Sequence, residues 1–387
     1  MSRNLASRLA LIVETEINVL TRRQLLTRGA ALSGLSSWKV LAGDDSRNQT
    51  LFASAFSLNK DQHFFSIFDQ EGTIKWQQAL PERAHAPIVH PNKPIVAVVA
   101  RRPGFYIDLY KIDSGQRLMR IEPEKDHHFY GHGLFTPDGL SLITQENHYP
   151  SGQGKIVIRS VATGEVLKQF PSYGIGPHES CLLNNDTLVV ANGGLQTHPD
   201  NDRRILNLET MQASLCFISL TTGELINKLV LPVELHQLSI RHLDINKEGS
   251  VAVGFQYQGD KWDDVPLVAT ANLKSEKLNF LPIPLNISRR LQHYCGSVTF
   301  DNIGQVLAVS SPRGNLIVYW DMKTDKYLSH HNFKDVCGLA STGIPNQFLM
   351  TTGTGKRVFV NPLTGETSNL ATMRQWKWDN HIHRLSI

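Results

Sequence analysis

The side chains with the greatest capacity for chemistry in this chain of 387 residues are imidazoles, thiols and guanidiniums. Imidazole nitrogens and thiolates are the usual protein ligands of zinc, copper and iron, and arginine pairs bidentately with carboxylates and phosphates. The candidates are widely separated: His85, His132, His178 with Glu179, Arg241 with His242, Cys295, Cys337 and His381. They form no CxxC or HxxxH pair with one another, so only the fold could gather them at one site.

A short turn followed by an apolar-polar alternating strand recurs along the chain and indicates a repeat architecture. Glycine or a small polar residue in each turn supplies the backbone geometry of a tight hairpin. The seven turns are Asp69–Gly72, Asp113–Gly115, Ala162–Gly164, Thr221–Gly223, Lys274–Glu276, Lys323–Asp325 and Leu363–Gly365. Their spacing of roughly 40 to 59 residues matches the four short strands of one propeller blade.

The two ends of the repeat region complement each other. Residues 51–80 supply three strands with no inner strand before them, and residues 380–387 alternate like an inner strand with no partners after them. We therefore predict an all-β fold over residues 43–387, a seven-bladed β-propeller closed by pairing of the C-terminal strand with the N-terminal blade. Such closure removes exposed sheet edges. A pair of all-β sandwiches is the alternative.

In a propeller the inner strands of all blades begin at one mouth of the central channel, so the candidate residues would meet there. Three interpretations stay open. The residues could pack or be solvated without a ligand, or Cys295 and Cys337 could form a disulfide, which an oxidising compartment permits. The third is an iron, copper or zinc site formed by His132, His178, His242, Cys295, Cys337 and His381. Cys181 and Cys216 lie in apolar strands and are expected in the core.

Loops between the second and third strands of each blade are expected on the same face as the channel mouth. The longest, about residues 192–215, suggests a lid or a partner surface. Together with the inner strands, these loops supply the candidate ligand-binding residues Arg101, Arg102, Glu146, His148, Glu179, His198, Arg241, Tyr257 and Arg313. The four arginines in this set could hold a carboxylate or a phosphate.

The N-terminal segment, residues 1–42, is interpreted as an export signal and predicts a periplasmic protein. Thr21–Leu26 reads Thr-Arg-Arg-Gln-Leu-Leu, which resembles a twin-arginine motif, and cleavage is expected after Ala42. An amphipathic helix with two adjacent arginines is the alternative. No apolar run after residue 45 approaches the roughly 20 residues that span a bilayer. The formal charge of +4 includes no concentrated basic stripe, which argues against nucleic-acid binding.

Several short segments give the chain a family resemblance. They are Gly131–Gly133, Gly174–Glu179, Asn207–Met211, Arg241–Asp244 and Asp335–Gly338. In these segments the chain resembles a bacterial family of twin-arginine-exported propellers that lack an assigned function and are commonly found beside imelysin-type, iron-regulated periplasmic proteins. The resemblance covers nearly the whole chain after the signal. It implies a periplasmic role linked to iron or another transition metal, with imelysin-type proteins as partners.

Three hypotheses of function follow from these observations. The first is a monomeric periplasmic binding module whose channel mouth binds a metal, a metal complex or a partner protein in metal acquisition. The second is an enzyme that uses the His/Cys ring, either a redox protein or a metal-assisted hydrolase, because Gly176–Glu179 is similar to a segment of lactonase-type propellers. The third is a scaffold. The sequence carries no GxSxG, HExxH, P-loop or Rossmann motif. By its location, His178 or His242 could serve as a general base.

Overall fold

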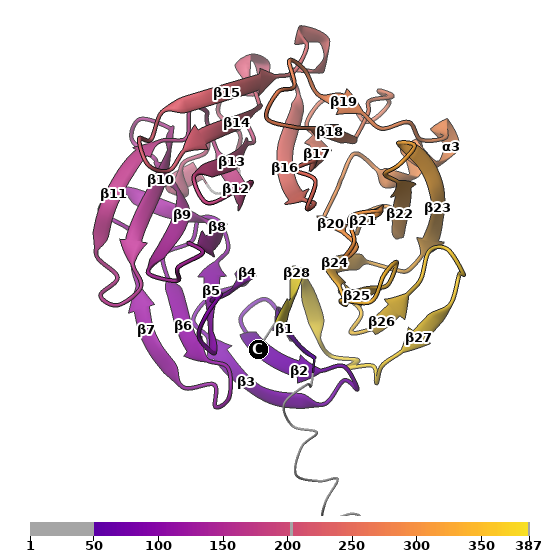
Figure 1. Cartoon of the computed structure of the whole chain (residues 1–387), viewed down its shortest axis with the longest axis horizontal. Helices are drawn as coiled ribbons and strands as arrows, with labels where there is room; N and C mark the ends of the chain where they lie inside the picture. The colour runs from indigo at the N-terminus through magenta and orange to yellow at the C-terminus, as the bar shows by residue number, and fades with distance from the viewer. Residues whose placement is uncertain (1–49, 202–203, 386–387) are drawn as a thin grey trace, which may run out of the picture. The chain divides into compact units, whose positions relative to one another are not determined.

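Seven four-stranded antiparallel sheets surround a central channel (Figure 1). The computed structural model describes residues 50–201 and 204–385. The predicted export signal, residues 1–42, lies outside the described residues. The seven sheets confirm the prediction of an all-β, seven-bladed propeller for the part of the chain that the structure describes. Among these residues no helix has the length and apolar character needed to cross a membrane.

Each blade runs from an inner strand beside the channel to an outer strand at the rim. The first two blades are β28 (Lys377–Leu385), β1 (Leu51–Ser57), β2 (His63–Asp69) and β3 (Ile74–Leu80), then β4 (Ala84–Val89), β5 (Ile95–Ala100), β6 (Ile107–Lys111) and β7 (Arg117–Ile121). The third and fourth are β8 (His127–Phe135), β9 (Ser141–His148), β10 (Gln153–Ser160) and β11 (Val166–Pro171), then β12 (Pro177–Leu182), β13 (Thr187–Asn192), β14 (Ser214–Ser219) and β15 (Leu225–Val230).

The remaining three blades follow in chain order. They are β16 (Leu238–Ile245), β17 (Val251–Tyr257), β18 (Val268–Ala271) and β19 (Asn279–Phe280), then β20 (Ser297–Phe300), β21 (Val306–Ser311), β22 (Leu316–Asp321) and β23 (Lys326–Asn332), and last β24 (Val336–Ser341), β25 (Phe348–Thr352), β26 (Arg357–Val360) and β27 (Thr367–Asn369). Short helical turns lie in the connections: η2 (Pro199–Asn201), η3 (Leu208–Thr210), η4 (Val233–Leu235), α3 (Leu285–Ser288) and η5 (Arg289–Leu291).

The C-terminal strand closes the ring, as the sequence predicts. Strand β28 pairs antiparallel with β1, with Leu385 opposite Leu51 and Ile382 opposite Ser54. The Ser54 hydroxyl also donates a hydrogen bond of 2.7 Å to the backbone carbonyl of His381. The first blade thus combines one strand from the end of the chain with three from its beginning, so its formation depends on contacts between distant segments.

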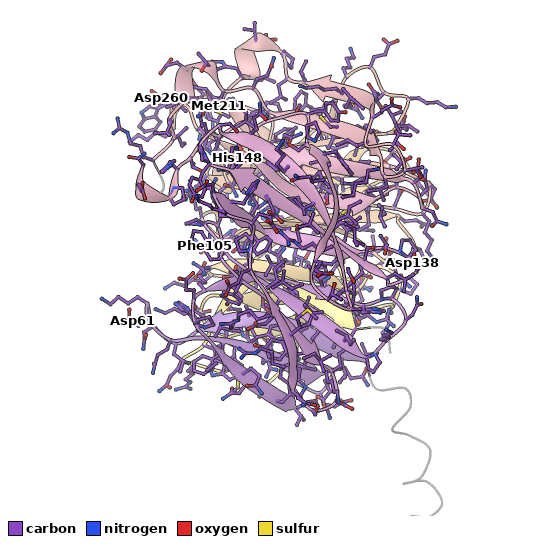
Figure 2. All side chains as sticks on the ribbon, turned by 90° about the vertical axis from the view of Figure 1, so that its left-hand side faces the viewer. Asp61, Phe105, Asp138, His148, Met211 and Asp260 are labelled. Atoms are coloured by element: carbon purple, nitrogen blue, oxygen red, sulfur yellow. The ribbon has the colours of Figure 1, made fainter. Side chains whose placement is uncertain are left out.

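The connecting loops divide between two faces of the propeller. In the side view, Asp61, Phe105, His148, Met211 and Asp260 lie on one face, and all of them lie at or beside a connection between the second and third strands of a blade (Figure 2). Asp138, in the turn between β8 and β9, lies on the opposite face (Figure 2). The face that carries these loops is also the one where the inner strands begin, and it is called the loop face below.

Burial explains why the strands differ in pattern. Strand β5 reads Ile-Val-Ala-Val-Val-Ala and is buried at all but its first residue, because neighbouring blades cover both of its faces. The outer strand β3 instead alternates between exposed and covered positions, since one of its faces meets solvent. The apolar core therefore lies between the blades. Polar side chains of the inner strands line the channel.

Candidate functional site

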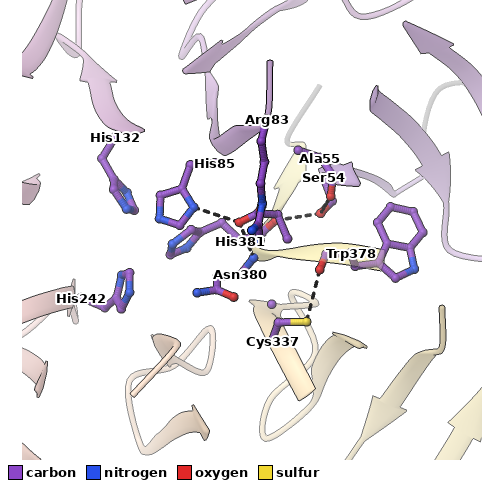
Figure 3. Close-up of polar contacts among 12 residues, drawn as sticks. Ser54, Ala55, Arg83, His85, His132, His242, Cys337, Trp378, Asn380 and His381 are labelled. Atoms are coloured by element: carbon purple, nitrogen blue, oxygen red, sulfur yellow. Dashed lines mark hydrogen bonds and ion pairs between the residues drawn. The ribbon is translucent and has the colours of Figure 1, made fainter. Parts of the chain in front are cut away.

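Five histidines from five inner strands converge in the channel. They are His85 of β4, His132 of β8, His178 of β12, His242 of β16 and His381 of β28, and they are called the imidazole cluster below. His178 is half-buried and the other four are buried. The ring centroids of His132 and His381 lie 4.5 Å apart, and those of His178 and His242 lie 4.9 Å apart. Figure 3 shows the rings of His85, His132, His242 and His381 around a common space.

A bulge or another register irregularity accompanies each of these histidines. The pairing of each of the five inner strands with its neighbour shifts register within one or two residues of the histidine: between Ala84 and Pro87, Phe129 and Gly133, Pro177 and Glu179, Ile240 and His242, and opposite Ser54 and Phe56 on β1. Such irregularities re-aim side chains and are frequent next to functional sites. In β8, Gly131 has φ +101°, and a Cβ atom there would lie 2.8 Å from Cδ2 of His85.

Two carboxylates orient three of the rings. The Glu179 oxygens lie 3.3 Å from Nδ1 of His132 and 3.1 Å from Nδ1 of His242. Asp379 lies 2.9 Å from Nδ1 of His85 and pairs with Nε of Arg83 at 2.6 Å. An ionised carboxylate only accepts hydrogen bonds, so each Nδ1 donates. In the neutral imidazole, Nε2 then carries a lone pair that is available to a metal ion.

Burial favours the neutral form of four of the five histidines, whereas their surroundings favour the charged form of the two carboxylates. Burial lowers the pKa of His85 to about 3, and burial also lowers the pKa of His242 and holds the pKa values of His178 and His381 well below the ordinary range. Burial alone would raise the pKa of Glu179, but the hydrogen bonds that it accepts from His132 and His242 hold it well below its usual value. Neutral imidazole is the form that binds metal ions.

Two overlapping groups of side chains have the composition and spacing of a metal site. In the first, His132, His178, Glu179 and His242 each offer one ligand atom, and these atoms lie within 4.8 Å of one another. The second group is His85, His132 and His381. Within these groups, Nε2 of His132, Nδ1 of His178 and Nε2 of His381 are buried without a hydrogen-bond partner in the part of the chain described. Buried nitrogens without partners are costly, and a bound cation would satisfy them.

The two cysteines of the predicted ring do not join the cluster. The thiol of Cys295 donates to the carbonyl of Leu267 at 3.3 Å, and that of Cys337 lies 3.4 Å from the carbonyl of Trp378 (Figure 3). Burial raises the pKa of Cys295 to about 12 and that of Cys337 further. Both are free, as are Cys181 and Cys216, so the disulfide interpretation does not describe this structure. Cys295 lies two residues before β20 begins, and Cys337 lies beside a register irregularity of β24, so the predicted inner-strand position does not fix the direction of either side chain.

A cavity of about 260 Å³ lies beside the cluster and contains four arginines. Arg101, Arg102, Arg241 and Arg313, all among the predicted ligand-binding residues, line it together with His85, Tyr130, His178, Leu195, Ile205, His242, Gln256, Gln258, Tyr294 and Asn380. A second cavity of about 230 Å³ reaches the cluster along Glu179, His242 and His381. His242 lines both cavities, so the imidazole cluster lies between them.

The structure places the other predicted ligand-binding residues away from the arginine cavity. Glu146 is buried inside its blade, where it pairs with Arg159 at 2.9 Å, because a buried guanidinium requires a counter-charge. His148 bonds Ser151 at 2.7 Å, and the ring of His198 packs 5.1 Å from that of Tyr149. Tyr257 donates to Asp263 at 2.6 Å and lines a separate cavity that contains Trp262. Glu146, His148 and Tyr257 lie in strands and His198 lies in a loop, and all four contact local partners.

Sequence reasoning missed the residues that support the site. Asp379 lies two residues before His381 in an alternating strand, a spacing that puts both on one face, and this could have indicated its role. Tyr130 lies two residues before His132 in the same way. Tyr294 and Gln258 offered no such signal, because their approach to the cavity depends on loop conformation. Asn380 lies in β28 between Asp379 and His381, where strict alternation would place it on the other face of the strand.

Comparisons with known proteins agree with the fold. The hydrazine synthase of Kuenenia stuttgartiensis is 14% identical, with a TM-score of 0.57 over 82% of this chain and 94% of that one. A chain of a mitotic checkpoint complex is 12% identical, with a TM-score of 0.55 over 74% of this chain and 76% of that one. At these identities the similarity concerns the propeller fold alone. No curated protein matches the chain.

A family model described as "Protein of unknown function (DUF1513)" matches residues 78–385. The match begins within strand β3 and ends at the last residue of β28, so it includes all five inner strands that carry the imidazole cluster. The chain therefore belongs to the DUF1513 family.

Proposed function

We propose that this chain is a periplasmic propeller that binds one transition-metal ion at the imidazole cluster and serves in the acquisition of iron or another transition metal. The observation that carries the proposal is the set of buried imidazoles whose Nδ1 atoms are held by Glu179 and Asp379, which leaves their Nε2 atoms free of these carboxylates. Metal-binding histidines commonly donate their other nitrogen to a carboxylate in this way. The family resemblance supports the export and the partnership with imelysin-type proteins.

The first of the two groups is the better metal site. Its imidazoles, His132, His178 and His242, are accompanied by the charge of Glu179, which offsets part of the charge of a divalent ion. Bond lengths of about 2.0–2.1 Å to nitrogen place the ligands of a tetrahedral ion roughly 3.4 Å apart. Ligand atoms within 4.8 Å of one another reach that spacing by small side-chain rotations. His132 belongs to both groups but has only Nε2 free of Glu179, so one ion per chain is expected.

If the three imidazoles alone held the ion, with Glu179 accepting hydrogen bonds from two of them, a fourth coordination position would remain, and His178 and His242 also line the arginine cavity. An open position is typical of metal sites that bind an exogenous ligand or activate water. A metal-assisted hydrolase is therefore the second candidate function, and the cavity beside the cluster is the observation that favours it. The redox alternative that relied on a His/Cys ring loses its support, because the thiols of Cys295 and Cys337 bond backbone carbonyls.

Metal binding is tested with the full chain purified from the periplasm, stripped with a chelator and titrated with Zn²⁺. We expect one ion per chain in the wild type and a large loss of affinity in His178→Ala and in His242→Ala. His381→Ala should retain the ion, because it removes a residue of the second group only. His236→Ala, outside the cluster, is the matched control. Absence of stoichiometric binding in the wild type, or equal loss in the control, would contradict the proposal.

Export and partnership are tested separately. Replacing both Arg22 and Arg23 with lysine should leave the protein in the cytoplasm, as measured by fractionation of the cells. Co-purification with an imelysin-type protein from the periplasm should survive the Arg374→Gln change, an exposed position outside both cavities. Unchanged periplasmic accumulation of the double-lysine variant would contradict the export route without bearing on the metal site.

A further inference from the structure

We infer that the arginine cavity is a binding site for a small, multiply charged oxyanion, a polycarboxylate or a phosphate, which also coordinates the metal ion at the imidazole cluster. The juxtaposition that carries this inference is a buried, unpaired arginine next to two imidazoles of the metal site. The inference that the arginines bind an anion depends only on the geometry of the cavity. The inference that the same anion coordinates a metal ion rests on the proposed function.

Arg241 is the central observation. Its side chain is 5% exposed, and Nε is buried without a hydrogen-bond partner. Within residues 50–201 and 204–385 the structure contains no hydrogen bond or ion pair of this guanidinium. Two other arginines are buried among the described residues, and both have partners: Arg159 pairs with Glu146 at 2.9 Å, and Arg357 donates to the carbonyl of Ala371 at 3.0 Å and lies over the ring of Phe68. A buried charge without a counter-charge is strongly unfavourable. A bound anion would supply the counter-charge that Arg241 lacks.

The surroundings of Arg241 extend the positive field. Arg101, Arg102 and Arg313 line the same cavity, and no aspartate or glutamate does so among the described residues. The guanidinium of Arg313 stacks on the ring of Tyr294 at 4.5 Å, which holds it at the cavity. Several guanidiniums around one space provide the forked donors that carboxylates and phosphates accept. A neutral ligand would leave the charge of Arg241 uncompensated.

The volume of the cavity and the two histidines in its wall restrict which ligands it can bind. A volume of about 260 Å³ is below the range of about 300–1,000 Å³ typical of pockets for drug-sized ligands, which indicates a compact molecule. His178 and His242, two of the three proposed metal ligands, form part of the same wall as Arg241. One oxyanion can therefore contact guanidiniums and occupy the open coordination position. The metal would then enter or leave as an anionic chelate.

The experiment is calorimetric titration of the full chain, metal-free and loaded with Zn²⁺, with citrate and with inorganic phosphate. We expect the metal-free protein to bind at least one of these anions, and Zn²⁺ to tighten that binding at least tenfold. The anion should tighten Zn²⁺ binding by the same factor, because coupling is reciprocal. Preference for citrate would identify a carboxylate chelate as the ligand, and preference for phosphate would identify an inorganic oxyanion.

Variants separate the anion site from a structural role of the arginine. Arg241→Met should weaken anion binding at least tenfold and raise the melting temperature of the ligand-free protein, since it removes an unpaired buried charge. Arg313→Gln, at an exposed position, should weaken binding several-fold with the fold unchanged. Arg384→Gln, in the second cavity, is the matched control and should bind as the wild type does.

Failure of the anion site and failure of the proposed metal binding would give different results in these experiments. Anion binding that depends on Arg241 in a protein that takes up no Zn²⁺ would support the anion site while contradicting the proposed metal function. Absence of anion binding in both forms, or wild-type affinity together with a lower melting temperature in Arg241→Met, would overturn the inference. Zn²⁺ binding with no effect on anion affinity would overturn the shared coordination.

Discussion

Acidification should destabilise the metal-free protein because the imidazole cluster is buried in its neutral form. The pKa of His85 is about 3 in the folded protein, and those of His178, His242 and His381 are also lowered. The unfolded chain, with histidine pKa values near about 6.5, binds protons that the folded chain excludes. Stability is therefore complete above about pH 6.5 and is lost as the pH falls from there toward the folded-state values.

The magnitude follows from the size of these shifts. Between pH 7 and pH 5, one histidine that stays neutral in the fold costs about 2 kcal/mol of unfolding free energy. The four histidines together set an upper bound of about 8 kcal/mol, against a total stability of about 5–15 kcal/mol for a typical domain. Asp244 opposes this trend by about 1 kcal/mol, because burial raises its pKa to about 6 and its neutral form is favoured in the fold. A net loss of several kcal/mol is expected.

Urea unfolding at pH 7 and at pH 5 measures this loss in the wild type and in His381→Gln. The variant should lose about 2 kcal/mol less than the wild type over the same interval, because it removes one of the proton-excluding groups. The comparison cancels the contributions of all other titrating residues. Equal stability of the wild type at the two pH values, or an identical pH dependence in the variant, would refute the reasoning about buried neutral imidazoles.

Three further predictions concern the supports of the site. Glu179→Gln should lower metal affinity about 10- to 100-fold, measured by chelator competition, because the amide no longer accepts from both histidines as an anion does; unchanged affinity would contradict this role. Gly131→Ala should lower thermal stability by about 1–3 kcal/mol, since φ +101° is unfavourable for alanine and its Cβ would meet His85; an unshifted melting curve would count against it. Cys295 and Cys337 should react with a thiol reagent only after unfolding, as followed by mass spectrometry, because both thiols are buried; rapid labelling of the native chain would show otherwise.

The propeller fold could be predicted from the sequence because turns and alternating strands recur along the chain. The seven turns, and the unmatched strands at the two ends, determine both the number of blades and the closure by β28. The same logic placed His132, His178, His242 and His381 on inner strands, where the structure brings them together. Position along an inner strand is a property of chain topology, so a topological argument can find it.

The direction of individual side chains could not be predicted in this way. Register irregularities around the histidines change which face a residue presents, and no turn signal records them. Cys337 lies in the inner strand β24 and Cys295 lies just before the inner strand β20, but both thiols bond backbone carbonyls. Glu146 and Tyr257, which lie at or near the ends of β9 and β17, likewise bond Arg159 and Asp263, which are local partners that topology does not reveal.

Anomalous diffraction from crystals of the Zn²⁺-loaded full chain, recorded at the zinc absorption edge, tests the metal site most directly. The account predicts one strong peak per chain, within bonding distance of ring nitrogens of His132, His178 and His242. A peak confined to the surface, or a channel without anomalous signal at saturating Zn²⁺, would contradict it.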